Sequence, residues 1–442
     1  MSTSEPKIPT RVPGRRVASS PEPAGLPVSV NALQKADRFL FAPLCLVLTL
    51  LRRISREPDS SQPAHPRSLL FVKLAEQGST VLAARAIRQA AKWVGRNNVY
   101  FLVFEENRFV LDVMELLPAD NVFTIPTTSL RAMVFGAVRI LRQIRRRRID
   151  AAVDLEFFAR FSAALTWLTK TRWRAGMHAF YGEGPFRGDL FTHRVLYNPH
   201  IHTSAMFFTL VEALKRPAAR LPTLDFVSDQ ASDPEPMFVP SPEETARVKT
   251  MIFEKSGATE GVKLILLNPN AGDLLPLRRW PQERYSILAR RTLEELPEVY
   301  AVFTGIKKEA AAVDDLVRVV GSPRCFSLAG RTSLRELLVL YNLSEVLVTN
   351  DSGPAHFAVL TPIDVVTLFG PETPSLFAVS TPRNTVIFRG LACSPCVSAL
   401  NNRQSVCKDN QCMKQISVEE VFEAVIAAYR RRVAQTPAVV SG

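Results

Sequence analysis

The fold is decided by the stretch Glu345-Val-Leu-Val-Thr-Asn-Asp351-Ser352-Gly353-Pro-Ala-His-Phe-Ala-Val-Leu360. Its apolar run, 346–348, is typical of a buried parallel strand. Asp351 and Ser352 suit the cap of a following helix, and Gly353 lets another molecule approach the backbone. A helix that begins at the carboxyl end of a strand can bind an anion with its free N–H groups. Taken alone, the stretch fits an ordinary strand-to-helix turn better than a binding site.

Composition limits the classes of protein that the chain can belong to. It has 442 residues, 47% of them apolar and 22% charged, which is enough for two globular domains with full cores. The net charge of +13 indicates an anionic partner. Aromatic and basic residues do not interleave as they do in nucleic-acid modules, so a membrane surface or a phosphorylated substrate is favoured over nucleic acid.

The first 66 residues read as a tail followed by a membrane-associated segment. Residues 1–33 are rich in Pro, Ser and Arg and predict a disordered tail. Residues 34–66 hold an apolar helix and a linker. The apolar run is about thirteen residues, short of the roughly twenty that span a bilayer. We expect an interfacial or re-entrant helix, bent at Pro43. The alternative is a helix packed on the protein's own surface.

Alternating strands and helices then predict a first parallel-sheet domain over 67–232. Residues 172–225 read as irregular, with His202 a candidate for the cleft. A basic helix end, 142–148, fits either a solvated face or contact with anionic lipid. The expected strands are 68–74, 99–104, 122–125 and 151–155, and the expected helices are 80–95, 106–117, 129–148 and 157–171.

A Pro-rich linker, 233–245, leads to a second domain over 246–442. Its pattern is again doubly wound, so the predicted fold class is α/β with two Rossmann-like parallel sheets facing across a cleft. A helix over 417–433 closes the chain. The expected strands are 262–268, 300–304, 345–349, 365–369 and 386–388, and the expected helices are 242–255, 281–296, 307–320, 333–342 and 354–360.

Several loops at the carboxyl ends of the second domain's strands carry small residues, arginines and one carboxylate. A diphosphate-linked sugar needs such groups: glycines for close approach, Arg and helix N-termini for phosphate, and a carboxylate for hydroxyls. The chain has neither a P-loop nor a dinucleotide fingerprint. The candidate residues in these loops are Asn270, Gly272, Arg278, Gly330, Asp351, Ser352, Gly353, His356 and Gly370.

These motifs resemble the heptosyltransferase family of glycosyltransferases, strongly over 262–425 and more weakly over 68–90 and around 154–156. The resemblance rests on Arg278-Arg-Trp-Pro281, Leu328-Ala-Gly-Arg-Thr-Ser-Leu334, Asn350-Asp-Ser-Gly-Pro-Ala-His356, Leu368-Phe-Gly-Pro371 and Cys393-Ser-Pro-Cys396.

The resemblance implies a GT-B fold and an inverting transfer of a sugar, often heptose from ADP-heptose. The acceptor would be a lipopolysaccharide-type or other envelope glycan, at the cytoplasmic face of the inner membrane. It implies that Asp351 holds the donor sugar, with Ser352, Gly353 and His356 beside it. It also implies that Arg278 contacts donor phosphate or sugar, and that no metal is required.

One departure from the family pattern concerns the catalytic base. The family's first loop usually reads Gly-Asp, and that Asp deprotonates the acceptor, whereas this chain has Gly78-Ser79. Serine cannot act as that base near neutral pH without activation. Glu76 is the substitute that we expect, with Glu156 as second choice. This departure leaves open a catalytically silent, membrane-associated binding protein on the same fold. A transferase of another hexose is a further alternative, since the donor turn recognises features that many hexoses share.

The cysteines offer one possible metal site. Cys393, Cys396, Cys407 and Cys412 are spaced as two close pairs. Such pairs can hold Zn²⁺ tetrahedrally in a structural site, and the alternative is reduced, unliganded thiols or disulfides.

Overall fold

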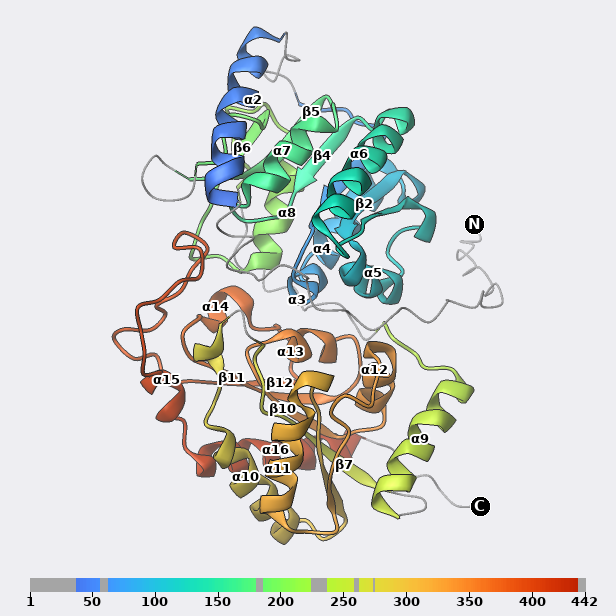
Figure 1. Cartoon of the computed structure of the whole chain (residues 1–442), viewed down its shortest axis with the longest axis vertical. Helices are drawn as coiled ribbons and strands as arrows, with labels where there is room; N and C mark the ends of the chain where they lie inside the picture. Colours follow the sequence, from blue (N-terminus) through green and yellow to red (C-terminus); the bar gives the residue numbers. More distant parts are fainter. Residues whose placement is uncertain are drawn as a thin grey trace, which may run out of the picture.

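The computed structural model describes residues 37–55, 63–179, 186–223, 237–257, 262–272 and 275–435. The whole of the predicted N-terminal tail, 1–33, and parts of both predicted linkers lie outside these ranges. The chain forms two domains stacked along its long axis, with the N-terminal domain above the C-terminal one in Figure 1.

The N-terminal domain is built on a six-stranded parallel sheet in the order β3-β2-β1-β4-β5-β6. Its central strands are buried on both faces, which explains their continuous apolar sequences. The strands are β1 Leu69–Val72, β2 Val99–Phe104, β3 Val122–Ile125, β4 Ala151–Asp154, β5 Trp173–His178 and β6 His193–Leu196. The helices are α3 Gln77–Val81, α4 Ala84–Val94, α5 Arg108–Met114, α6 Leu130–Arg147, α7 Arg160–Leu168 and α8 Thr203–Leu214.

The prediction that residues 172–225 are irregular was wrong. This region supplies β5, β6 and α8. Strand β5 contains a buried arginine, Arg174, whose guanidinium donates to the carbonyls of Leu190 and Thr171. Strand β6 begins with His193, whose ring lies within hydrogen-bond distance of Thr192 and Arg216. These polar residues interrupt the apolar pattern, although their side chains are satisfied inside the fold.

The C-terminal domain repeats the arrangement with a parallel sheet in the order β12-β11-β10-β7-β8-β9. Strand β9 was not predicted, since it is only three residues long. The strands are β7 Lys263–Asn268, β8 Val299–Phe303, β9 Cys325–Ser327, β10 Val346–Asn350, β11 Asp364–Phe369 and β12 Asn384–Phe388. The helices are α9 Pro242–Ser256, α10 Gln282–Glu295, α11 Ala310–Val320, α12 Leu334–Asn342, α13 Gly353–Ala358, α14 Pro374–Phe377, α15 Gln411–Lys414 and α16 Val418–Gln435.

The loops at the carboxyl edges of the two sheets meet between the domains. Helix α3 of the first domain packs on α13 of the second. The rings of Phe157 and Phe377 meet edge to face with centroids 6.2 Å apart. His202 Nε2 lies 3.0 Å from the carbonyl oxygen of Ala378, so this histidine joins the domains as predicted for a residue at the cleft. In open parallel sheets this edge is where ligands bind.

Helix α2, Ala42–Ile54, packs along one side of the N-terminal domain. It follows a short π-helical turn, Asp37–Phe41. Cys45 and Leu48 are buried against Ala163, Ala164 and Trp167 of α7 and its neighbourhood. The inner side of α2 thus fits the alternative interpretation, a helix on the protein's own surface. Among the described residues, no helix combines the length and the apolar character needed to cross a bilayer.

A buried ion pair stabilises the N-terminal domain near the interdomain edge. Arg187 and Asp154 are both almost fully buried and bonded to each other. Arg187 also donates to the carbonyls of Phe157 (3.0 Å) and Met177 (3.2 Å). It therefore joins the loop after β4 to the end of β5.

We expect Arg187→Met to lower the free energy of unfolding by about 3–5 kcal/mol, because the Asp154 carboxylate would lose its buried partner. Chemical denaturation monitored by circular dichroism measures this loss. Arg194→Met is the matched control, since Arg194 is half exposed and lies 3.4 Å from Asp189. Its expected cost is below about 1 kcal/mol. Equal losses of unfolding free energy in the two variants would contradict the stabilising role assigned to the Arg187–Asp154 ion pair.

Candidate active site

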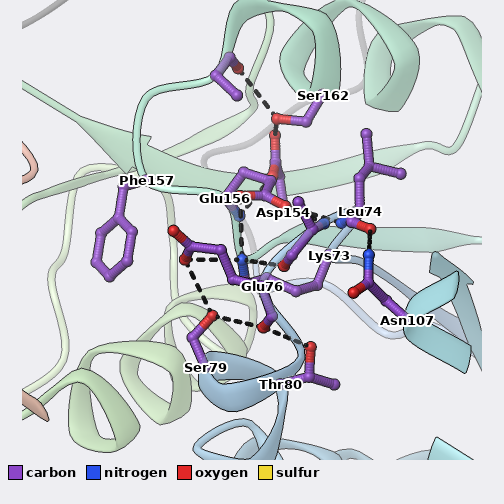
Figure 2. Close-up of polar contacts among 12 residues, drawn as sticks. Lys73, Leu74, Glu76, Ser79, Thr80, Asn107, Asp154, Glu156, Phe157 and Ser162 are labelled. Carbon is purple, nitrogen blue, oxygen red and sulfur yellow. Dashed lines mark hydrogen bonds and ion pairs between the residues drawn. The ribbon is translucent and has the colours of Figure 1, made fainter. Parts of the chain in front are cut away.

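A buried lysine fixes the loop that follows β1. The Lys73 side chain is fully buried, and its Nζ lies 3.1 Å from Glu156 Oε2. The other oxygen of that carboxylate accepts the backbone N–H groups of Leu74 (2.8 Å) and Ala75 (3.1 Å). Figure 2 shows these contacts around the turn that presents Glu76. Glu156, the second candidate for the base, is thus occupied in holding this turn.

Glu76 places a carboxylate at the tip of the same turn. Its backbone has φ 65°, a left-handed conformation that costs a residue other than glycine roughly 1–2 kcal/mol. Ser79 Oγ donates to Glu76 Oε2 at 3.2 Å, and Lys73 Nζ lies 3.7 Å from the same oxygen. Arg403, from the other domain, pairs with Glu76 Oε1. Ser79, which replaces the family's usual aspartate, therefore orients the carboxylate that we expect to act as base.

The charge of Glu76 is set by its neighbours. Burial acts to raise the pKa of this carboxyl group, but Arg403, Lys73 and the Ser79 hydrogen bond together lower it to about 2. Glu76 is therefore ionised at neutral pH. A base must be deprotonated to accept a proton, so this condition is met. The ion pair with Arg403 also makes Glu76 a weak base for as long as that pair lasts.

On the opposite side, Asn350 joins three loops of the second domain. Its Oδ1 accepts the backbone N–H of Trp280 at 3.0 Å, and its Nδ2 donates to the carbonyl of Asn270 at 3.1 Å. This arrangement brings Arg278, two residues before Trp280, beside the turn after β10. Arg278 Nη1 lies 3.6 Å from Asp351 Oδ2. Two candidate residues that are distant in sequence therefore meet.

The turn after β10 differs from the prediction in its capping. Neither Asp351 nor Ser352 caps α13 through its side chain: Ser352 Oγ donates instead to the carbonyl of Asn350 at 3.1 Å. Asp351 stands before the helix with its carboxylate toward Arg278. Gly353 opens the helix. The Asp351 carboxylate therefore does not cap the helix that follows it.

Five buried side-chain atoms around these loops have no hydrogen-bond partner in the part of the chain that the structure describes. They are Asn270 Nδ2, Arg278 Nε, Asp351 Oδ2, His356 Nδ1 and Glu372 Oε1. Leaving one such atom unpaired costs about 1–3 kcal/mol, and most proteins contain few of them. The group offers both donors and acceptors, which is the set that a sugar diphosphate would satisfy.

His356 lies directly against the first domain. A Cβ on Gly78 would come within 2.7 Å of His356 Cδ2, so only glycine allows α3 to pack this closely on α13. Burial lowers the pKa of His356 to about 4, with Asp351 raising it and Arg278 lowering it. The imidazole is therefore neutral at physiological pH and suits hydrogen bonding rather than charge pairing.

Local structure explains why glycine is required at three further predicted positions, 272, 330 and 370. Gly272 and Gly330 have φ values of 65° and 68°, which other residues rarely adopt. A Cβ on Gly330 would also come within 2.7 Å of Lys307 Cα. A Cβ on Gly370 would collide with the side chain of Met413. These positions shape the loops of the site, and Gly370 also makes room for the core beneath it.

Arg403 and Glu372 are functional candidates that sequence analysis did not select. Arg403 pairs with Glu76, and its Nε lies 3.5 Å from Glu372 Oε1. The rings of Phe157 and Phe377 flank its guanidinium at 5.8 and 5.2 Å. The sequence signal for Glu372 was its place after Gly370-Pro371. No sequence signal pointed to Arg403, because it lies in the loop between cysteines that the sequence analysis assigned to a zinc site.

Glu372 is held in an unusual protonation state for a carboxyl group. Burial raises its pKa to about 7, and Asp351 adds to this effect while Arg403 and Arg278 oppose it. Three carboxyl groups, of Glu76, Asp351 and Glu372, thus share the site with two guanidinium groups. Such perturbed groups concentrate at functional sites.

The four cysteines of the predicted zinc site all lie in the described part of the chain, and the zinc site stays a prediction. All four thiols are free, with Cys393 exposed and Cys412 buried. Within the described ranges, no group of three or more Cys, His, Asp or Glu residues is arranged to hold a metal ion. Cys396 Sγ and Cys407 Sγ instead meet Ser405 Oγ and the carbonyl oxygen of Asp409, each at 3.2 Å.

Comparison with known proteins decides the family. The sequence model of glycosyltransferase family 9 (heptosyltransferase) matches residues 137–407. The chain belongs to this family. Lipopolysaccharide heptosyltransferase 1 of Campylobacter coli is 20% identical over 360 residues, which is 81% of this chain and 97% of the relative. Lipopolysaccharide heptosyltransferase 2 of Salmonella typhimurium is 29% identical, but the match spans only 32% of this chain and 40% of that protein.

Solved structures show that this family 9 member shares the fold of its relatives. The structure of E. coli ADP-heptose lps heptosyltransferase II matches with a TM-score of 0.62 at 19% identity, over 82% of this chain and 99% of that one. A glycosyl transferase family 9 protein from Veillonella parvula matches equally well, with a TM-score of 0.62 at 18% identity over 85% of this chain. These similarities confirm the predicted GT-B architecture of two parallel-sheet domains.

Proposed function

We propose that this family 9 glycosyltransferase moves a heptose from ADP-heptose, with inversion, onto a lipopolysaccharide-type or other envelope glycan. The observation that carries the proposal is the pairing of Arg278 with Asp351 among five buried polar atoms that lack a hydrogen-bond partner in the described part of the chain, two of which belong to this pair. Among structures with the same fold, E. coli heptosyltransferase WaaC has been solved with ADP-2-deoxy-2-fluoro heptose. A nucleotide-diphosphate sugar fits the donors and acceptors of this site.

The reaction is a single displacement. The Glu76 carboxylate takes the proton of an acceptor hydroxyl while that oxygen forms a bond to the anomeric carbon. The bond from the anomeric carbon to the diphosphate oxygen breaks, and the leaving diphosphate keeps the electron pair. Arg278 faces the negative charge that develops there, and Asp351 accepts hydrogen bonds from sugar hydroxyls. Two guanidinium groups are available to balance this charge, so the proposed mechanism requires no metal.

The proposal is tested by measuring release of ADP from ADP-heptose with the full chain and a panel of lipid-linked glycan acceptors. We expect acceptor-dependent ADP release that is retained in the presence of a chelator. Failure of ADP-heptose to bind at all, together with an unchanged result for Asp351→Ala, would refute it. Turnover with a different nucleotide sugar would identify a transferase of another hexose.

A catalytically silent binding protein is the second candidate. It is favoured by one observation: Ser79 occupies the position of the family's base, and Glu76 is paired with Arg403. Such a protein would bind the donor, yet it would show no turnover with any acceptor. Transfer that disappears in Glu76→Gln excludes this candidate.

We also propose that the protein works at the cytoplasmic face of the inner membrane, as a peripheral or monotopic protein. The net charge of +13 and the apolar outer side of α2 support this location. The lipid-linked acceptor would be presented there.

Glu372 should make donor binding depend on pH. Its pKa of about 7 means that it is mostly protonated at pH 6 and mostly ionised at pH 8. A bound diphosphate adds negative charge and raises that pKa further, so donor binding takes up a proton. The affinity for ADP-heptose is therefore expected to fall between pH 6 and 8, roughly tenfold for each unit by which the pKa rises. Calorimetric titrations should show this slope in the wild type and a flat profile in Glu372→Gln. An identical slope in both would contradict the assignment.

A further inference from the structure

Helix α2 has two different sides. Its inner side is fixed to the N-terminal domain: Arg52 Nη1 lies 2.7 Å from Asp189 Oδ1, and Thr49 Oγ1 accepts the backbone N–H of Asp189 at 2.9 Å. The Asp37 carboxylate before it accepts the backbone N–H groups of Arg160 (2.9 Å) and Phe161 (3.0 Å) at the start of α7. The outer side exposes large apolar side chains, namely Phe39, Leu40, Leu46, Val47, Leu50, Leu51 and Ile54.

Helix α6 repeats this pattern. Its inner residues, including Ile140 and Ile144, are buried in the core cluster on one face of the first sheet. The first half of its outer side exposes Leu130 (63%), Val134 (53%) and Phe135 (74%). The second half of the helix carries exposed arginines, with Arg142 following Val134 and Val138 at helical spacing. The outer side of α6 is therefore apolar at its start and basic at its end.

The two outer sides belong to the same face of the molecule. Helix α7 lies between α2 and α6, as Figure 1 shows, and it packs on both. Arg145 of α6 donates to the carbonyl of Leu168 at the end of α7. Helix α6 starts after the carboxyl end of β3, and Asp37 meets α7 where that helix follows the carboxyl end of β4. The apolar start of α6 and the turn before α2 thus lie at the edge that faces the active site.

A basic hollow lies at the other end of this face. It has a volume of about 280 Å³ and is formed where α6 and α7 end and β4 and β5 begin. Four cationic side chains line it, those of Arg145, Arg148, Lys170 and Arg172. Asp150 is the acidic residue in its lining, and its carboxylate already accepts the backbone N–H of Arg67 at 2.8 Å. The net charge of the hollow is strongly positive.

We propose that the outer sides of α2 and α6, together with the basic hollow, form a docking surface for an anionic phospholipid bilayer. The apolar side chains would enter the boundary between head groups and acyl chains, and the arginines would meet lipid phosphates. Neither Ala42–Ile54 nor Leu130–Arg147 contains an acidic residue. A second copy of the same face would bring like charges together, which disfavours a symmetric dimer. This docking surface adds a membrane partner to the proposed function. It rests on that function in one respect only, that the acceptor is linked to a lipid.

The test is co-sedimentation of the full chain with vesicles. We expect binding to vesicles of phosphatidylglycerol and phosphatidylcholine, and weaker binding to phosphatidylcholine alone. The double variant V134E/F135E should reduce the partition coefficient roughly tenfold or more. Val319→Glu is the matched control, because Val319 is 54% exposed on α11 of the other domain. Circular dichroism should show that all variants are folded.

A second variant separates the electrostatic contribution. R142Q/R146Q should weaken binding to the anionic vesicles about fivefold for each arginine at low salt and leave binding to neutral vesicles unchanged. Equal binding by the wild type and V134E/F135E would overturn the proposal, as would a wild-type chain that binds no vesicle. Analytical ultracentrifugation showing a dimer that V134E/F135E dissociates would assign the surface to a second copy instead. Binding of ADP-heptose in solution, measured in parallel, shows whether the catalytic proposal fails separately.

Discussion

Glu76→Gln is expected to reduce the turnover number by roughly 10²–10⁴-fold, the usual contribution of a positioned general base. Glutamine keeps the size of the side chain and can still accept the hydrogen bond from Ser79 Oγ, but it cannot take a proton. The substitution also removes the ion pair with Arg403. Donor affinity should change far less than turnover, because the groups assigned to the donor, Arg278 and Asp351, lie in the other domain.

The matched control for this experiment is Ser79→Ala. It removes the 3.2 Å hydrogen bond to Glu76 without removing the carboxylate, so turnover should fall much less than in Glu76→Gln. Single-turnover kinetics with saturating donor and acceptor would separate chemistry from binding. If Glu76→Gln retains turnover while Glu372→Gln loses it, the base is Glu372, and the assignment of Glu76 is wrong.

Removal of the Arg278 guanidinium is expected to cause the second large loss of turnover. Arg278→Met should lower the turnover number by roughly 10²–10³-fold, because the leaving diphosphate would lose a preorganised positive charge. The Michaelis constant for the donor should rise as well. Arg318→Met on the exposed surface of α11 is the control and should leave both constants unchanged, since its side chain is 76% exposed.

Arg278 and Asp351 should also act as a unit. Their side chains lie 3.6 Å apart, and each leaves one buried atom without a hydrogen-bond partner among the described residues. A double-mutant cycle with Arg278→Met and Asp351→Asn is therefore expected to be non-additive, the double variant losing less than the two single losses combined. Additive losses would show that the two residues bind separate parts of the donor.

Most strands could be predicted because a parallel sheet covered on both faces demands continuous apolar sequence. Val99–Phe104 and Val122–Ile125 match their predicted bounds. Strands β5 and β6 could not be predicted in this way, because Arg174 and His193 are buried with polar partners that only the folded chain supplies. The apolar sequence pattern detects strands whose buried residues are apolar. It does not detect a strand whose buried polar residue is hydrogen-bonded inside the fold.

The candidate site was predictable where it lies within motifs and unpredictable where it depends on long-range contacts. The turn at Asp351 and the Arg278 loop could be read directly from the sequence. Arg403 could not, because it meets Glu76 across 327 positions of the chain.

The ion pair between Arg403 and Glu76 has a consequence for motion. The acidity of a group in one domain is governed by a charge that the other domain carries. Any rotation that parts the domains withdraws that charge and lets the pKa of Glu76 rise from about 2 toward its ordinary value. The proton affinity of the Glu76 carboxylate thus depends on the distance between the two domains. Opening of the domains and uptake of a proton by Glu76 are therefore thermodynamically linked.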